Sequence, residues 1–387
     1  MAATGVGAGD LATSAIAGSR IGWSALTAIC IGAVIKYFLN EGLIRWQFDT
    51  NSTLIEGAIR YYGRLAQYLF MGYLIVWSFT VGVALMSASG ISLHALIPVF
   101  KDAATAKWVY GALLSILGVI LVRRGGYHWF ERLMSFAIIL MVTTVFVTVF
   151  FVSADMEPIT PGGLIPSDID MEWFVAVLGG VGGTVTILCY GYWVRERGRS
   201  DQTALSISRL DLLAAYAITG LLGISMVIIG GQIQISGGGA SLLVQLSDIL
   251  QLQLGTVAGW IFRIGAFAAI FSSLLGVWQS VPYLFTNLVQ LIKNQECQVN
   301  AQSPLYQWSL YGLAIVPMVG LPFGFAGMQK LYALCGALFI PLLALTLLLL
   351  HFRPVEVKGT YRNSILLNGF LVLVIFFFGW LTFKLIF

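Results

Sequence analysis

The sequence predicts an all-α membrane protein built from two related halves. Three observations predict this fold class: an apolar composition, a series of long apolar runs, and two glycine-rich interruptions, one near the start of each half. Hydrophobic residues make up 58% of the 387 residues, charged residues make up 10%, and the mean hydropathy is +0.89. A soluble domain needs roughly 25% charged residues to cover its surface. The composition therefore excludes a soluble enzyme, a nucleic-acid-binding protein and a disordered chain.

The apolar runs give the expected transmembrane spans, because a bilayer core about 30 Å thick needs roughly 20 mostly apolar residues per helix. The segment Leu11–Gly22 is too short to cross a bilayer alone and is interpreted as the outer half of a first span. Complete spans are expected at Trp23–Leu43, Leu65–Ser87, Trp108–Val122, Phe130–Val152, Trp173–Trp193, Leu210–Ile233, Val257–Phe285, Tyr306–Pro322, Leu331–Phe352 and Asn368–Ile386. Short loops join them. Residues 1–387 are therefore expected to form a single membrane domain, with repeats at 1–153 and 173–352 and an extra helix at 368–386.

Positively charged residues indicate how these spans are oriented. If the N-terminus is cytoplasmic, the cytoplasmic loops carry Arg45, Arg60, Arg64, Arg123, Arg124, Arg132, Arg195, Arg197, Arg199, Arg209, Lys293, Arg353, Lys358 and Arg362. The outer side then carries only Arg20, Lys101, Lys107, Lys330 and Lys384. Cytoplasmic loops of membrane proteins are enriched in Lys and Arg. We therefore expect a multi-pass protein of the plasma (inner) membrane with a cytoplasmic N-terminus.

Two glycine-rich stretches interrupt the expected helices. Gly5–Asp10 opens the first segment, and Gly179–Thr184 lies inside the span that begins at Trp173. Glycine lowers helix stability by about 1 kcal/mol per residue, and unwound backbone at membrane depth needs partners such as a bound cation. Two interruptions five spans apart are typical of an inverted-repeat transporter with a binding site near the bilayer midplane. Close packing of helices through small residues explains either cluster alone, but it explains the matched pair less well.

The residues around the interruptions form two motifs, Gly9-Asp10-Leu11-Ala12-Thr13 and Gly182-Gly183-Thr184-Val185-Thr186. The first resembles the first-helix motif Asp-Pro-Gly-Asn-x-Ala-Thr of the Nramp divalent-metal transporters. The second resembles their sixth-helix motif Gly-Ala-Thr-Val-Met-Pro-His. Supporting matches are Arg124-Gly125-Gly126-Tyr127 with Glu131, and Gly336-Ala337-Leu338-Phe339-Ile340-Pro341. The resemblance covers essentially the whole chain. It implies a LeuT-type inverted repeat of five plus five helices with an eleventh C-terminal helix.

The resemblance also implies a metal site, formed here by Asp10, Gly7, Gly183 and Thr186. The metal-binding Asp of the family falls on Gly7 and its Asn on Asp10, while the sixth-helix Met falls on Thr186 and the coordinating carbonyl on Gly183. The site thus loses its sulfur ligand. Oxygen ligands suit hard cations such as Mg²⁺, Ca²⁺ or Mn²⁺. We therefore expect an oxygen-only site for magnesium or another hard cation, whereas the family implies manganese or iron. A monovalent cation, or no ion, stays open.

Ionisable groups within the spans are few. Only Asp10 and Glu41 are expected to place carboxylates there, and Glu41 is expected to pair with Arg45 and Lys36. Arg263 either neutralises a carboxylate or extends to the membrane surface. Because a proton-coupled carrier needs ionisable groups along its path, we expect facilitated or weakly coupled transport. Asp10 has a second interpretation, compatible with the first, as the N-cap of a helix that begins at Leu11.

The segment before Asp10 is shorter than the inner half-helix of a LeuT-type first span, so this helix is interpreted as truncated at its N-terminus. We expect the open reading frame to extend upstream by roughly 15–30 residues that include an apolar run. If the inner half-helix is missing, the cytoplasmic gate is missing with it.

Two other functions stay open beside metal transport by alternating access. One is a LeuT-fold carrier of an organic solute, with aromatic walls from Tyr190, Tyr192, Trp193 and Trp278. The other is a non-transporting membrane receptor that kept the fold. Hydrolase and ATP-binding motifs do not occur in the sequence, so no enzyme is expected. The expected partners are the lipid bilayer and the transported cation, with no cofactor, no nucleic acid and no obligate protein partner.

Overall fold

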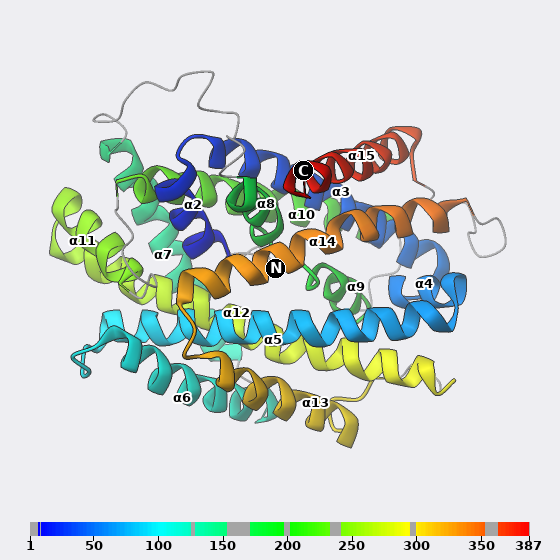
Figure 1. Ribbon diagram of the computed structural model, residues 1–387, viewed down its shortest axis with the longest axis horizontal. Helices are drawn as coiled ribbons and strands as arrows, with labels where there is room; N and C mark the ends of the chain where they lie inside the picture. Colours follow the sequence, from blue (N-terminus) through cyan, green and yellow to red (C-terminus); the bar gives the residue numbers. More distant parts are fainter. Residues whose placement is uncertain are drawn as a thin grey trace.

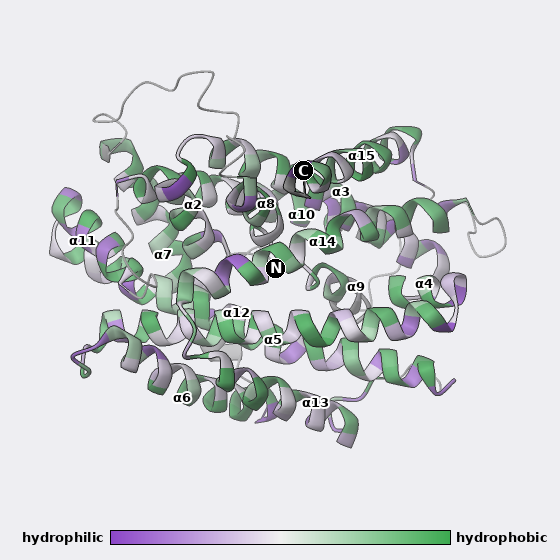
Figure 2. Ribbon diagram, in the orientation of Figure 1, coloured by the Kyte–Doolittle hydropathy of each residue, from purple (hydrophilic) through white to green (hydrophobic). Residues whose placement is uncertain are grey.

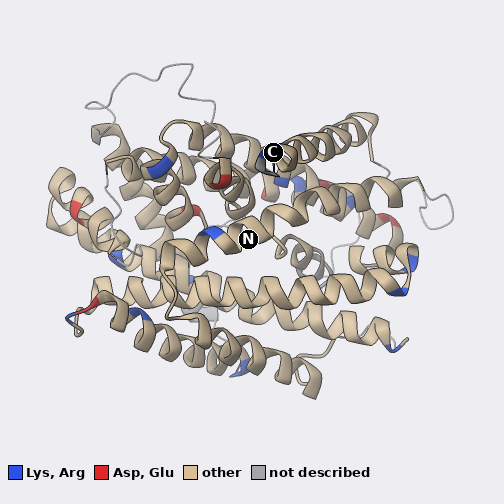
Figure 3. Ribbon diagram, viewed as in Figure 1, with Lys and Arg blue, Asp and Glu red and all other residues tan. Residues whose placement is uncertain are grey.

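The computed structural model describes residues 7, 9–124, 128–152, 171–196, 202–232, 241–294, 299–352 and 363–386. In these residues all regular structure is helical. The longest helices lie along the long axis of the molecule (Figure 1), and apolar residues predominate in them (Figure 2). Charged residues are sparse along these helices and gather mainly toward their ends (Figure 3). The prediction of an all-α membrane protein is therefore confirmed.

In the residues that the structure describes, the helices fall into sixteen segments that follow one another along the chain. They are η1 (Gly9–Thr13), α2 (Ser14–Ile21), α3 (Ser24–Thr50), α4 (Leu54–Tyr62), α5 (Arg64–Leu96), α6 (Ala103–Arg124), α7 (His128–Val152), α8 (Met171–Gly180), α9 (Ile187–Glu196), α10 (Gln202–Gly230), α11 (Leu242–Leu254), α12 (Thr256–Ile292), α13 (Pro304–Ile315), η5 (Val316–Gly320), α14 (Phe325–His351) and α15 (Ile365–Ile386).

Each expected span coincides with one helix or with two consecutive helical segments. The segment expected at Leu11–Gly22 consists of the π-helical turn η1 and the α-helix α2. The span expected at Trp173–Trp193 is divided into α8 and α9, as the glycines of this stretch predict. In the described part of the chain, seven helices are long and apolar enough to cross a membrane by length and composition.

Two short helices, α4 and α11, lie outside the expected spans. The helix α4 begins with a capping box: Thr53 Oγ1 accepts a hydrogen bond from the Glu56 N–H at 3.2 Å, and Glu56 Oε2 accepts one from the Thr53 N–H at 3.1 Å. The helix α11 packs against α12. There Arg263 Nη2 lies 3.3 Å from the Asp248 carboxylate. Of the two interpretations of Arg263, the structure supports the one in which it pairs with a carboxylate.

The charged residues of α3 differ in part from the expectation. Glu41 Oε1 lies 3.0 Å from Arg45 Nη2 and 2.7 Å from Arg209 Nη2 of α10, so the expected pair with Arg45 is confirmed and a second arginine joins it. The expected pair between Glu41 and Lys36 is wrong, because the Lys36 ammonium binds the backbone of a different helix instead. A spacing of five residues turns the two side chains toward different sides of a helix, since only residues three or four apart are neighbours.

Candidate functional site

The two interrupted helices meet at the centre of the molecule. The chain leaves α8 after Gly180 and becomes helical again at Ile187. Gly182 has φ +72° and Gly183 has φ +83°, a left-handed conformation that residues with a Cβ rarely adopt. On the first segment, Gly9 packs so closely on Gly180 that a Cβ at this position would overlap the Gly180 carbonyl. Glycine is therefore needed both to unwind the second helix and to bring the two segments together.

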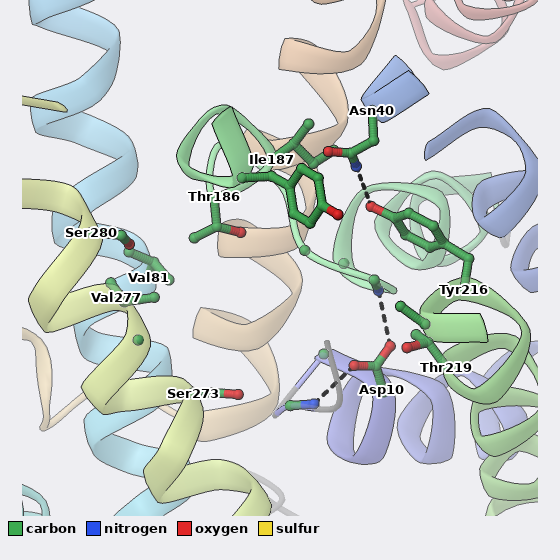
Figure 4. A pocket seen from close by; sticks show the side chains of 18 of the residues that line it. Asp10, Asn40, Val81, Thr186, Ile187, Tyr216, Thr219, Ser273, Val277 and Ser280 are labelled. Atoms are coloured by element: carbon green, nitrogen blue, oxygen red, sulfur yellow. Dashed lines mark hydrogen bonds between the residues drawn. The ribbon is translucent and has the colours of Figure 1, made fainter. Parts of the chain in front are cut away.

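Asp10 joins the two interruptions through its carboxylate. Its side chain is 2% exposed, Oδ2 accepts a hydrogen bond from the Gly7 N–H at 2.9 Å, and Oδ1 accepts one from the Gly182 N–H at 2.9 Å (Figure 4). These donors lie before Asp10 and in the other interrupted helix. The N-cap interpretation predicts bonds to the amides that follow Asp10, so the observed bonds do not support it.

A cavity of about 140 Å³ lies between the two interruptions. Gly7, Asp10, Gly183 and Thr186, the four residues expected to bind metal, all line it. Helices α3, α5, α10, α12 and α14 complete the wall. In Figure 4 the side chains of Asp10, Thr219, Thr186 and Ser273 surround the open space from three sides. The structure therefore brings the expected residues together.

The ligand chemistry of this wall is narrow. The lining residues that the structure describes include Asp, Asn, Ser, Thr and Tyr side chains, but no His, Cys or Met. Among the described residues, no group of three or more His, Cys, Asp and Glu side chains is close enough to hold a metal ion. A cation in the cavity would therefore be bound mainly by neutral oxygen atoms with few carboxylates.

Sequence reasoning missed a second carboxylate at the cavity. Asp211 of α10 lines it, and Tyr190 Oη donates a hydrogen bond to Asp211 Oδ2 at 3.3 Å. Asp211 precedes the cavity residue Thr219 by eight positions, which is about 12 Å along a helix at 1.5 Å per residue. The expectation that only Asp10 and Glu41 place carboxylates within the spans is therefore wrong. Asp211 stood at the edge of the expected span, where a charge is ordinary, so its position gave no signal.

Sequence reasoning also missed the role of Lys36. Its side chain is fully buried, and its ammonium donates hydrogen bonds to the Gly179 carbonyl at 2.8 Å and to the Val181 carbonyl. One turn further along α3, Asn40 Nδ2 donates to Tyr216 Oη at 2.5 Å. Lys36 of α3 thus binds the end of the first half of the interrupted helix, and Asn40 of α3 binds α10. The signal in the sequence was a lysine in the middle of an apolar span.

The aromatic residues proposed as walls are only partly at the cavity. Tyr190 lines it, whereas Trp278 is fully buried in the hydrophobic core and is not part of the lining. The side chains of Tyr192 and Trp193 lie outside the described residues. Aromatic contacts come instead from Trp77, Tyr216 and Tyr332. On α12, Ser272 and Ser273 face the cavity, although neither was included among the expected ligands.

Proteins of known structure share this fold. The chain resembles the structure of a manganese transporter of Eremococcus coleocola in complex with an aromatic bis-isothiourea substituted compound, with a TM-score of 0.74 and 14% identity, over 98% of this chain and 83% of the other. A histidine-to-alanine mutant of that transporter gives a TM-score of 0.71 at 14% identity, with the same coverage. MhsT in complex with L-phenylalanine gives a TM-score of 0.67 at 14% identity, over 99% and 97%.

Identities this low show only that the fold is shared, and the LeuT-type fold expected from the sequence is thereby confirmed. None of the curated protein sequences matches the chain. The family model described as natural resistance-associated macrophage protein-like matches residues 1–387, which is the full sequence. The chain therefore belongs to the Nramp family of membrane transporters, and it is not an enzyme.

Proposed function

We propose that this protein carries a divalent metal cation across the membrane by alternating access, and that the cation binds in the cavity between the two interrupted helices. The observation that carries the proposal is the buried Asp10 carboxylate, which faces a cavity lined by both interruptions. Membership of the Nramp family supports the substrate class, and the similar manganese transporter supports it further. In this proposal Asp10 supplies the charge, the Gly7 and Gly183 carbonyls and the Thr186 hydroxyl supply neutral ligands, and no cofactor takes part.

The cation is proposed to be hard and partly hydrated. Sulfur and imidazole ligands favour softer transition metals, whereas carboxylate, hydroxyl and carbonyl oxygens suit Mg²⁺, Ca²⁺ and Mn²⁺. In the described lining, the side chains that could bind a cation are those of Asp, Asn, Ser, Thr and Tyr, which all offer oxygen. Mg²⁺ usually keeps several waters and needs only one or two carboxylates. A cavity of about 140 Å³ leaves room for such waters. We therefore propose Mg²⁺ or Mn²⁺ as the substrate, and iron as a poorer one.

Transport is proposed to be facilitated, or only weakly coupled to protons. A proton path needs ionisable groups in series through the membrane. The described cavity residues include two carboxylates, Asp10 and Asp211, and no histidine. Asp10 already accepts hydrogen bonds from the Gly7 and Gly182 N–H groups. The cavity thus offers few groups that could exchange a proton for each cation.

The first prediction is that Asp10→Asn abolishes most cation uptake. The protein is reconstituted in liposomes, and uptake of Mg²⁺, Mn²⁺ and Ca²⁺ is measured with and without a pH gradient. A hydrogen bond or ligand contact to a charged group contributes about 1.5–3 kcal/mol, which corresponds to a loss of roughly 10- to 100-fold in apparent affinity. The matched control is Asp102→Asn. Asp102 is exposed, and the Ala104 and Thr105 N–H groups that donate to it hold the pKa of its carboxyl below the ordinary value, so the control also removes a real charge.

Four results would contradict parts of this proposal. Equal uptake by Asp10→Asn and the wild type would remove the cavity from the mechanism. Uptake of neither Mg²⁺ nor Mn²⁺ by the wild type would contradict the hard-ion argument. A fixed ratio of protons to metal ions would contradict uncoupled transport. Uptake of an amino acid in place of every cation would show a different substrate class.

One observation favours an organic solute as the second candidate. Trp77, Tyr190, Tyr216 and Tyr332 line the cavity, and the Trp77 indole nitrogen is fully buried without a hydrogen-bond partner. A buried donor without a partner is unfavourable unless a ligand supplies an acceptor. A similar fold binds L-phenylalanine in MhsT. Uptake of labelled phenylalanine is therefore measured beside the metals, with Trp77→Phe as the variant that removes the donor.

A further inference from the structure

The Lys36 ammonium lies in an unusual place for a lysine. Lys36 is fully buried in the middle of α3, and its nitrogen donates to the Gly179 and Val181 carbonyls. The Gly179 carbonyl lies in the last turn of α8, and the Val181 carbonyl lies directly after its end. In a continuous helix they would accept bonds from the amides four residues later. These are the amides of Gly183 and Val185, and the positive φ of Gly182 and Gly183 takes the chain off the helical path at this point.

One peptide group connects Lys36 to Asp10. The carbonyl of Val181 and the N–H of Gly182 belong to the same peptide unit. Its oxygen binds the Lys36 ammonium, and its N–H binds the Asp10 carboxylate at 2.9 Å. A peptide dipole of about 3.5 D with this orientation is stabilised at both ends. The interrupted helix is thereby fixed between a side chain of α3 and a side chain of η1.

Carbonyls that a helix leaves without donors form the kind of site that holds a free cation. In transporters with interrupted helices, unwound backbone carbonyls coordinate Na⁺ or H⁺. The carbonyls of Gly179 and Val181 are of this kind, and an acidic side chain lies close by. An ammonium group and a small monovalent cation both interact favourably with carbonyl oxygens, because both are positively charged. The lysine side chain differs because it is covalently attached and cannot leave.

We propose that the Lys36 ammonium is a built-in substitute for a monovalent cation, and that removing this side chain turns the Gly179–Val181 carbonyl site into a site for a free monovalent cation. The wild-type protein then needs neither Na⁺ nor K⁺ to keep the interrupted helix in place. This inference does not depend on the identity of the transported substrate. It concerns the Gly179 and Val181 carbonyls, which bind Lys36, whereas the proposed metal site faces the cavity.

The test is a substitution series measured by thermal unfolding of the whole protein in detergent, without any transported substrate. Lys36→Ala opens the site, Lys36→Met fills it without charge, and Lys107→Ala is the matched control. Lys107 is also buried and also donates to a backbone carbonyl, that of Phe323 at 2.6 Å, but it lies on α6, away from the break. Each protein is measured in choline chloride and then in ammonium or sodium chloride at equal ionic strength.

We expect Lys36→Ala to unfold at a lower temperature than the wild type in choline chloride and to recover saturably in ammonium or sodium chloride. At a cation concentration of about five times the dissociation constant, the unfolding midpoint should rise by about 1–2 °C. The wild type, Lys36→Met and Lys107→Ala should not respond in this way. An equal response by all four proteins would show a general salt effect and would overturn the proposal. No response by Lys36→Ala would overturn the proposal, because the opened site would then not bind a cation.

If Lys36→Ala does not fold, the proposal is still tested by Lys36→Gln and by the wild type. Lys36→Gln keeps N–H donors for the two carbonyls but removes the positive charge. If Lys36→Gln is as stable as the wild type, only hydrogen bonding matters and the proposal is wrong. A wild-type protein whose stability requires sodium would also overturn it, because the site would then need a free cation in addition to the lysine.

Discussion

Gly182 and Gly183 are the residues at which the backbone of the second interrupted helix changes direction. Both have positive φ, and a Cβ on Gly182 would lie 2.9 Å from the Tyr216 ring. Their conformation also aims the Gly182 N–H at Asp10. The shape of the cavity therefore depends on two residues that contribute no side chain to it.

We predict that Gly182→Ala destabilises the protein. A residue with a Cβ in the left-handed region costs about 1–2 kcal/mol, and the contact with Tyr216 adds to this cost. The free energy of unfolding is measured by chemical denaturation in detergent. The control is Gly312→Ala in α13, where a Cβ meets nothing within 4 Å. Alanine is favoured over glycine inside a helix by about 0.5–1 kcal/mol, so Gly312→Ala should not destabilise. Equal stabilities of the two variants would contradict the argument.

Single residues were predictable only where the sequence carried a motif. Asp10, Gly183 and Thr186 follow from the two motifs, and the structure places them at one cavity, although their ligand role stays a prediction. Lys36 and Asp211 could not be found in this way. Their positions depend on how α3 and α10 are rotated about their axes, and apolar spans buried on several sides have no clear polar face that would indicate this rotation.

At the scale of elements, the long helices were predictable and the short ones were not. Apolar length indicates a span, but α4 has only nine residues and does not reach that length. Its signal was local instead. Thr53-Leu54-Ile55-Glu56 is a capping-box sequence, and both of its reciprocal hydrogen bonds are present. Asn287 of α12 also donates to Glu56 at 3.4 Å, so this start of α4 is tied to a long helix.

We predict that Thr53→Ala weakens the start of α4. Loss of an N-cap hydroxyl costs about 0.5–2 kcal/mol. Hydrogen exchange of the amides of residues 54–57 should therefore become faster, while exchange in the middle of α12 should not change. Thr382→Ala is the control, because Thr382 lies inside α15 and donates only to a carbonyl of its own helix, that of Phe378. Unchanged exchange in α4 would show that packing alone holds this helix.

At the scale of the whole molecule, the two expected repeats are related through pairs of helices. The interruptions belong to the first and sixth expected spans, and they touch at Gly9 and Gly180. The third and eighth expected spans are α5 and α12, with 33 and 37 residues. These long helices pack together (Figure 1), and residues of both line the cavity. This correspondence supports the proposed boundaries of the repeats at 1–153 and 173–352.

The orientation in the membrane is the last prediction, and α5 makes it testable. A helix of 33 residues is about 50 Å long at 1.5 Å per residue, so its two ends lie on opposite sides of a bilayer core about 30 Å thick. Arg60 is exposed on α4, next to the first residue of α5, and Lys101 is exposed in the loop after α5. The excess of Lys and Arg in the loops near Arg60 predicts that this end is cytoplasmic.

The measurement is labelling of single cysteines with a membrane-impermeant maleimide, after the four native cysteines are replaced. Lys101→Cys should react in intact cells, and Arg60→Cys should react only after the membrane is permeabilised. Reaction of Lys101→Cys in intact cells also requires that the protein lies in the plasma membrane, because an internal membrane would hide both positions. The reverse pattern would invert the orientation.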